Sequence, residues 1–97
     1  MNPAEEQLAR QLWALGDAVR LRILQRLPRT AEDCCDWNVS KLAEELGLSQ
    51  PTLSHHLRIL RQAGVVSYTK KCRDCFYWVR EEDTKAILDA MHALLKR

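Results

Sequence analysis

The apolar residues of this 97-residue chain recur at intervals of three and four positions in five separate stretches. Such spacing places side chains on one side of an α-helix, so the pattern predicts five amphipathic helices. Leu8, Leu12 and Leu15 of the first stretch are an example. The predicted helices cover about residues 3–16, 17–28, 40–47, 49–64 and 81–97. The predicted N-caps of the first four helices are Asn2, Asp17, Ser40 and Ser49.

Between the fourth and fifth helices the pattern changes to residues that favour β-strands. The runs VVSYTKK and FYWV flank the sequence CRDC. They predict a β-hairpin over about residues 65–80, with a two-residue turn at Arg73 and Asp74. Residues 37–39 are a candidate for one more short strand, which would lie alongside residues 76–79.

The third and fourth helices predict a helix-turn-helix over about residues 39–63. Ala43 permits close packing of the two helices, and Gly47 permits the bend between them. A hairpin directly after such a unit is a wing. The chain has 46% hydrophobic residues, enough for one modest core. We therefore predict a mainly α-helical fold with a small β-hairpin, in which residues 1–97 form a single winged helix-turn-helix domain.

The fourth helix has a polar face that is suited to DNA. Its apolar stripe is Leu53, Leu57 and Leu60, and Gln, Ser, His and Arg side chains lie on the other side. These side chains can bind base edges and phosphates, although most polar helix faces contact only water. Basic residues of the wing can reach neighbouring phosphates, and Asp74 is the one acid nearby. The predicted DNA-binding residues are Gln50, Thr52, Ser54, His55, Arg58, Lys70, Lys71 and Arg73.

The composition of the chain indicates in which cell compartment it works, whereas its net charge does not indicate its partner. No apolar run approaches the about 20 residues of a membrane span, and MNPAEEQLAR lacks the pattern of a signal peptide. We expect a cytoplasmic protein without membrane contacts. The four cysteines are then expected as thiols for metal or redox chemistry rather than as structural disulfides. The net charge of +2 is too small to identify a partner.

The sequence resembles the ArsR/SmtB family of winged-helix repressors of bacteria and archaea. The resemblance is carried by LWALGDAVRLRIL at residues 12–24, by KLAEELGLSQPTLSHHLRILRQAGVV at residues 41–66, and by FYWV in the returning wing strand. It implies a homodimer built from terminal helices at about residues 3–16 and 83–97. It also implies double-stranded operator DNA with two-fold symmetry, and repression that an inducer relieves, often a metal or metalloid. Gln50, Ser54 and His55 match positions that the family uses for DNA contact.

The family's metal sites do not carry over to this chain. The common C-x-C pair of the family corresponds here to Asn38 and Ser40. A second family site uses paired Asp and His residues along the last helix, where this chain has only Asp89 and His92. Such residues on an exposed helix face are usually just solvated. A sensor site of either known kind is therefore not expected.

The chain's own cysteines are the alternative sensor candidates. Cys72 and Cys75 flank the predicted wing turn, where cross-strand Cα atoms are about 5.5 Å apart, within the range of a disulfide. One hypothesis is a joint site of Cys34, Cys35, Cys72 and Cys75 for a thiophilic ion such as Zn(II), Cd(II) or As(III). A second is a reversible thiol redox switch, and a third is that these cysteines have no sensory role.

Two functions of other classes are alternatives to a repressor. The C-x-x-C spacing is typical of thiol oxidoreductases, but there it opens a helix after a strand, whereas here it bridges a hairpin. A winged helix can also bind only protein partners. The prediction is a DNA-binding repressor, not an enzyme, which is released from its operator by a cysteine-bound metal or metalloid, with thiol redox sensing as the alternative.

Overall fold

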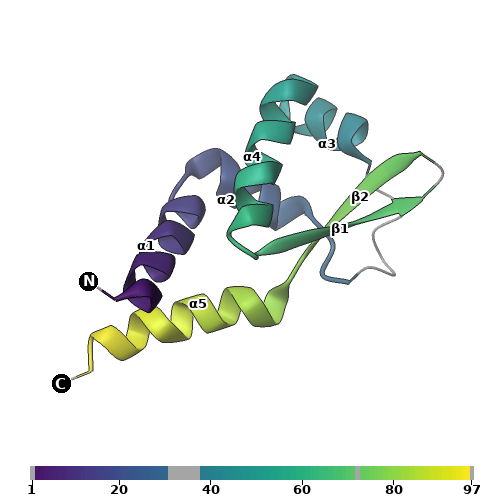
Figure 1. Cartoon of the computed structure of the whole chain (residues 1–97). Coiled ribbons are helices and arrows are strands. Elements are labelled where there is room, and N and C mark those ends of the chain that lie inside the picture. Colours follow the sequence, from purple (N-terminus) through teal and green to yellow (C-terminus); the bar gives the residue numbers. More distant parts are fainter. Residues whose placement is uncertain (1, 31–37, 72, 97) are drawn as a thin grey trace.

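The computed structural model describes residues 2–30, 38–71 and 73–96 of the chain. Within these residues, five helices accompany one two-stranded antiparallel hairpin, which confirms the predicted mainly α-helical fold (Figure 1). The elements are α1 (Pro3–Leu15), α2 (Ala18–Arg26), α3 (Val39–Leu46), α4 (Gln50–Gln62), β1 (Val66–Lys71), β2 (Asp74–Val79) and α5 (Glu81–Leu94). None of these helices is both long and apolar enough to cross a membrane. The helices α1 and α5 lie at the end of the molecule that carries both termini, and α3 and the hairpin tip lie at the other (Figure 1).

Three of the four predicted caps begin their helices as expected. The side chain of Asn2 accepts a hydrogen bond from the backbone N–H of Glu5 at 2.8 Å, and that of Asp17 accepts one from the N–H of Arg20 at 3.1 Å. Ser49 does the same for α4. Each cap satisfies one of the backbone donors that a helix leaves unpaired in its first turn.

The start of α3 differs from the sequence prediction. Asn38 is the cap, and its Oδ1 accepts a hydrogen bond from the N–H of Lys41 at 2.9 Å, so the predicted cap at Ser40 is wrong. Val39 is the first residue of the helix, and the strand predicted at residues 37–39 is therefore also wrong at this position. The capping hydrogen bond outweighs the β preference of valine. Residue 37 itself lies outside the described residues.

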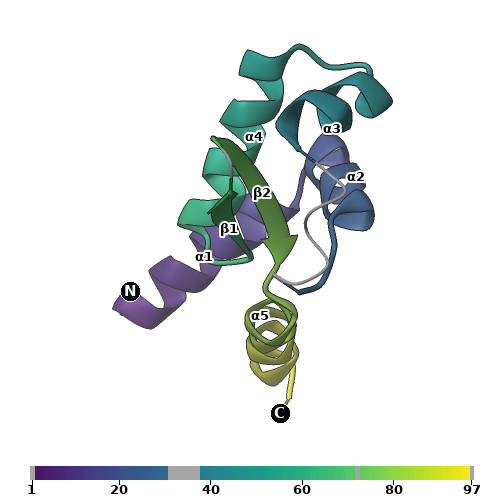
Figure 2. The same ribbon diagram turned by 90° about the vertical axis from the view of Figure 1, so that its right-hand side faces the viewer.

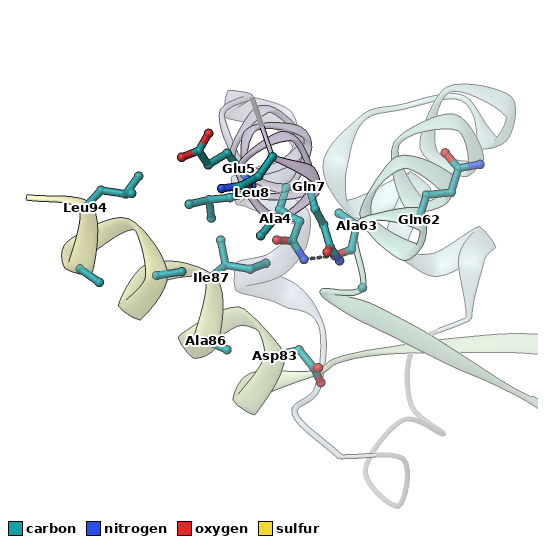
Figure 3. Close-up of a pocket in the computed structure, with 15 residues that line it drawn as sticks. Ala4, Glu5, Gln7, Leu8, Gln62, Ala63, Asp83, Ala86, Ile87 and Leu94 are labelled. Carbon is teal, nitrogen blue, oxygen red and sulfur yellow. Dashed lines mark hydrogen bonds between the residues drawn. The ribbon is translucent and has the colours of Figure 1, made fainter.

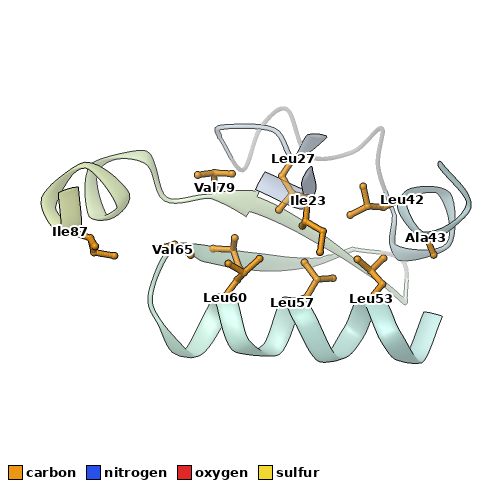
Figure 4. Packing of buried hydrophobic residues seen from close by; sticks show 11 residues of the cluster. Ile23, Leu27, Leu42, Ala43, Leu53, Leu57, Leu60, Val65, Val79 and Ile87 are labelled. Carbon is orange, nitrogen blue, oxygen red and sulfur yellow. The ribbon is translucent and has the colours of Figure 1, made fainter. Parts of the chain in front are cut away.

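The core is built around one face of α4. Leu53, Leu57 and Leu60 are fully buried and point towards the hairpin and towards Ile23 of α2 and Leu42 of α3 (Figure 4). Full burial of one leucine side chain contributes about 1.5–3 kcal/mol. The rotation of α4 about its own axis is therefore fixed, because any other rotation would expose this stripe.

The turn between α3 and α4 depends on Gly47. Its φ of 68° lies in the left-handed region, which residues with a Cβ atom adopt at a cost. The N–H of Leu48 donates to the carbonyl of Ala43 at 2.9 Å and closes the end of α3. The helix-turn-helix predicted from Ala43 and Gly47 is confirmed.

The cross-strand register of the wing hairpin differs by two residues from the expected one. Asp74 already belongs to β2 and pairs with Lys71, while Arg73 has a φ of 73°. The turn predicted at Arg73 and Asp74 is therefore wrong. The cross-strand partner of Cys75 is Lys70 and not Cys72, which itself lies outside the described residues. The residue in the left-handed conformation sets this register, because two-residue turns need positive φ angles.

Arg20 is a buried charged residue that sequence reasoning did not single out. Only 6% of its surface is exposed, and its Nε donates to the carbonyl of Ala14 at 2.7 Å. Its guanidinium lies 4.8 Å from the centroid of the Trp13 ring. Arg20 therefore satisfies a carbonyl that the end of α1 leaves unpaired and fixes α1 against α2. Its position one helical turn before Ile23, on the apolar side of α2, was the available signal.

Candidate nucleic-acid interface

The polar face of α4 lies in solvent opposite the buried leucines. All predicted DNA-binding residues of this helix are exposed, namely Gln50, Thr52, Ser54, His55 and Arg58. The helix has no acidic residue in its first turn, and Arg61 lies in its last turn. The exposed surface of α4 therefore presents hydrogen-bond donors and positive charge without a competing carboxylate of its own.

The beginning of this face is held by hydrogen bonds within the helix-turn-helix. The Nε2 of Gln50 donates to the hydroxyl of Ser40 at 3.0 Å, and the hydroxyl of Ser49 donates to the Oγ1 of Thr52 at 2.8 Å. Sequence reasoning missed this role of Ser40, because the two residues are ten positions apart and on different helices. The amide of Gln50 has a second N–H and a carbonyl oxygen, so it can bind a base edge while it keeps this contact.

The two adjacent histidines of α4 differ in their surroundings. His55 is exposed, whereas His56 is half-buried and its ring lies 5.8 Å from that of His55 between centroids. The Nδ1 of His56 is buried without a hydrogen-bond partner in the described part of the chain. Burial lowers the pKa of His56, and Arg20 and His55 lower it further, while Asp17 raises it. His56 is thus a neutral packing residue, and His55 is the histidine available to a ligand.

The wing lies beside α4 (Figure 2) and reaches away from that helix (Figure 1). Only residues 63–65 separate the end of α4 from β1. The three predicted phosphate-binding residues, Lys70, Lys71 and Arg73, are all exposed near the hairpin tip, with Asp74 beside them. On the base of the hairpin, Val66 and Val79 are buried in the core. The wing is therefore anchored at one end and carries its positive charge at the other.

The predicted thiol site falls largely outside what the structure describes. Cys34, Cys35 and Cys72 are not among the described residues, and Cys75 is a half-buried free thiol on β2. In residues 2–30, 38–71 and 73–96, no group of three or more His, Cys, Asp or Glu side chains could hold a metal ion. Asp89 and His92 are exposed on α5. The cysteine site stays a prediction.

Comparison with known proteins identifies the class. The family described as "Bacterial regulatory protein, arsR family" matches residues 17–68, which span α2 to β1 and include the whole helix-turn-helix. The chain belongs to this family, which confirms the resemblance seen in the sequence. Its relatives are transcriptional regulators with the winged helix-turn-helix fold, so the protein is a regulator and not an enzyme.

The matches extend over nearly the whole chain. An uncharacterised helix-turn-helix-type transcriptional regulator of Methanocaldococcus jannaschii is 37% identical over 89 residues, which cover 92% of this chain and 96% of that protein. A homologue of the cadmium resistance transcriptional regulatory protein CadC from Staphylococcus aureus is 32% identical over 98 residues. The match covers 92% of this chain and 77% of that protein. The structure of HlyU from Vibrio cholerae, a protein named a transcriptional activator, superimposes with a TM-score of 0.69 at 30% identity over 98% of both chains.

Proposed function

We propose that this regulator is a homodimeric, sequence-specific DNA-binding repressor. The observation that carries the proposal is the two-sided construction of α4. Its leucine stripe is fully buried, so its opposite face, with Ser54, His55 and Arg58, is rigidly presented to the surroundings. A helix presented in this way, next to a basic hairpin, has the geometry with which winged helix-turn-helix proteins enter the major groove.

The two parts of this surface have different tasks in the proposal. The α4 side chains read base edges, because Gln, His, Ser and Arg donate and accept in patterns that distinguish base pairs. Lys70, Lys71 and Arg73 of the wing bind phosphates, which fixes the register of the protein without reading sequence. Each phosphate contact releases counterions, so affinity falls as salt rises.

The proposed dimer interface consists of α1 and α5. Apolar side chains of α5 lie in solvent, with exposed fractions of 56% for Leu88, 38% for Met91 and 60% for Leu94. Beside them, a groove of about 690 Å³ is lined by α1, the end of α4 and α5, and Leu8 and Ile87 face it (Figure 3). A second copy of the chain covers this surface in the proposed dimer and forms a self-complementary two-fold interface. Two recognition helices α4 then lie on one side of the dimer, as a two-fold symmetric operator requires.

The inducer in the proposal is a thiophilic metal or metalloid bound through Cys34, Cys35, Cys72 and Cys75, with thiol redox sensing as the alternative. A relative whose name includes cadmium resistance supports the metal, and soft thiolates favour Zn(II), Cd(II) or As(III) over Mg(II). Intact mass and metal analysis of anaerobically purified protein, with and without these ions, tests the site. Binding that survives replacement of all four cysteines by serine argues against it, and a response to oxidant alone supports the redox alternative.

DNA binding is tested with a duplex selected by the protein from a random-sequence library. Fluorescence anisotropy should show binding to the selected duplex that is at least about 10³-fold tighter than to a scrambled one at physiological salt. Equal affinity for both duplexes at every salt concentration contradicts sequence-specific binding. Absence of binding even at low salt favours a winged helix that acts only on protein partners.

A further inference from the structure

A stack of three side chains connects α4 to the wing. The Cζ of Arg61 lies 5.2 Å from the centroid of the Tyr68 ring. The Tyr68 ring in turn lies 5.6 Å from the Tyr77 ring, with 40° between their planes, and the two tyrosines are paired across the hairpin. The contact therefore starts on the recognition helix, crosses β1 and ends on β2.

The stack lies between the buried base of the hairpin and its exposed tip. Alternate cross-strand pairs share one face of a hairpin. On this face Val66 pairs with Val79, Tyr68 with Tyr77, and Lys70 with Cys75. The valine pair is buried in the core, whereas Tyr68 is 41% exposed. The stack is thus the next layer outside the core, and the layer beyond it carries Lys70.

The connection between α4 and the wing needs such a support. It contains Gly64, whose φ of 81° is a conformation that side chains disfavour. Backbone hydrogen bonds hold the base of the hairpin, from Val65 N–H to the Leu60 carbonyl at 3.1 Å and from Arg80 N–H to the Val65 carbonyl at 2.8 Å. These bonds lie before the tyrosine layer. Beyond it, Phe76 is buried on the opposite face of the hairpin, so the stack supports the outer hairpin from the side of Arg61.

The chemistry of the stack favours a contact between a cation and neutral rings. Burial raises the pKa of Tyr77, so its phenol stays uncharged at neutral pH, although Arg61 acts in the opposite direction. A guanidinium is planar and stacks on aromatic faces, which an ammonium group does less well. Arg61 is exposed and lies one turn after Arg58 on α4. The alternative to stacking is that the Arg61 guanidinium binds a DNA phosphate directly.

We propose that Arg61 is a positioning residue, which holds the wing at a fixed angle to α4 by stacking on Tyr68. This angle sets where Lys70 meets the DNA backbone relative to the bases contacted by α4. The inference rests on the proposed DNA-binding function for its consequence, but the stack itself is a property of the protein without DNA. The two can therefore be tested separately.

The first arm measures amide hydrogen exchange of the hairpin in the full chain without DNA. Arg61→Met and Tyr68→Leu should each speed exchange of the outer hairpin amides by about two- to fivefold, the size expected for an exposed cation–π contact. The double variant should be no faster than the faster single variant, because both remove the same contact. Tyr68→Phe keeps the ring and should exchange like the parent, and Arg58→Met is the control for loss of a neighbouring arginine.

The second arm maps hydroxyl-radical cleavage of a duplex selected by the protein from a random library. Arg61→Met should lose protection of the flanking deoxyriboses, next to the phosphates contacted by the wing, and keep the protection given by α4. Arg61→Lys should show this flanking protection only in part. The proposal is overturned if Arg61→Met and Tyr68→Leu leave hairpin exchange unchanged, or if their effects are simply additive. It is also overturned if Arg61→Lys fully restores protection while Arg61→Met lowers the salt slope by about one, which identifies a phosphate contact. If the parent protects no duplex, the proposed function fails, and hydrogen exchange still decides the stack.

Discussion

Helices α4 and α5 are both amphipathic, yet their apolar faces have opposite surroundings. The three leucines of the α4 stripe are fully buried within one copy of the chain. On α5, Ile87 is buried, while Leu88, Met91 and Leu94 remain in solvent. The sequences alone do not distinguish the two helices, since each has apolar residues at intervals of three and four. The difference arises from how much core the rest of the chain offers.

This difference indicates which surface of each helix is available for function. On α4 the apolar side is fully used, so the polar side is left for a ligand. On α5 the apolar side is left, and a partner that covers it must itself be apolar and complementary. A substitution on either helix should therefore affect stability, assembly or DNA binding according to the face that it changes.

The largest effect is expected from a charge on the open face of α5. Leu88→Asp should dissociate the proposed dimer. A partner can bury only the 56% of Leu88 that is exposed in one copy, which for two copies amounts to about 2–3 kcal/mol, and two carboxylates buried at the interface add several kcal/mol more. Sedimentation at micromolar concentration should show a monomer with unchanged helix content. The matched control is Lys85→Asp, which puts the same carboxylate at an exposed position of the same helix. A parent protein that sediments as a monomer would contradict the proposal that a second copy covers the apolar face of α5.

A cavity on the closed face of α4 should have the next largest effect. Leu57→Ala should lower the free energy of unfolding by about 2–5 kcal/mol, since a fully buried leucine is removed from a packed site. Urea unfolding at a fixed protein concentration measures it. Gln62→Ala on the exposed side of α4 is the control and should change stability by less than about 0.5 kcal/mol. Equal losses for both would contradict the assignment of the two faces.

Truncation of the polar face of α4 should affect DNA binding and not folding. We expect His55→Ala to weaken binding to the selected duplex by about 1–3 kcal/mol, and to weaken binding to random DNA much less. Lys70→Gln in the wing should weaken both similarly and lower the salt slope by about one. Anisotropy titrations at several salt concentrations separate the two patterns. A loss for His55→Ala that is the same on both duplexes would mean that this face contacts only the backbone.

The smallest effect concerns pH and the side of α4 that packs on α2. The pKa of His56 is lowered in the folded protein, mainly by burial, so the unfolded chain binds a proton more readily. The stability that depends on neutral His56 should be complete above its unfolded pKa of about 6.5 and should decline as pH falls through the lower folded value. The charged or titratable groups near this ring are Asp17, Arg20 and His55. Urea unfolding at about pH 7.5 and about pH 5 should therefore differ more for the parent than for His56→Gln, and an equal difference would exclude His56 as the cause.

The parts of the fold that the sequence predicted correctly depend on residues that are close together in the sequence. Asn2, Asp17 and Ser49 bind backbone groups three positions away, and the leucine spacing of α4 is local as well. Where two local rules competed, the prediction failed. Both Asn38 and Ser40 can cap α3. In the structure Asn38 is the cap, and the hydroxyl of Ser40 accepts a hydrogen bond from Gln50 on another helix.

The exposure of the candidate DNA-binding residues was predicted from the sequence, but the contacts that support them were not. Exposure of His55 and Arg58 followed from helix geometry, whereas the contact of Arg61 with Tyr68 requires the angle between a helix and a hairpin. The register of the wing depended on which residue adopts a positive φ, and a β-turn sequence such as CRDC allows more than one choice. A register difference of two residues places Lys70, and not Cys72, opposite Cys75.

The hydrogen bond between Gln50 and Ser40 has a consequence for how such a regulator can diverge in evolution. In the proposed role of Gln50 at a base edge, a change of Gln50 that alters the preferred base also changes the partner of the Ser40 hydroxyl, and a change of Ser40 removes a hydrogen bond that holds Gln50. The two positions should therefore covary across descendants of one ancestral protein. In the described part of the chain His55 and Arg58 make no hydrogen bond to α3, so we expect them to vary independently and to provide the first steps towards a new operator.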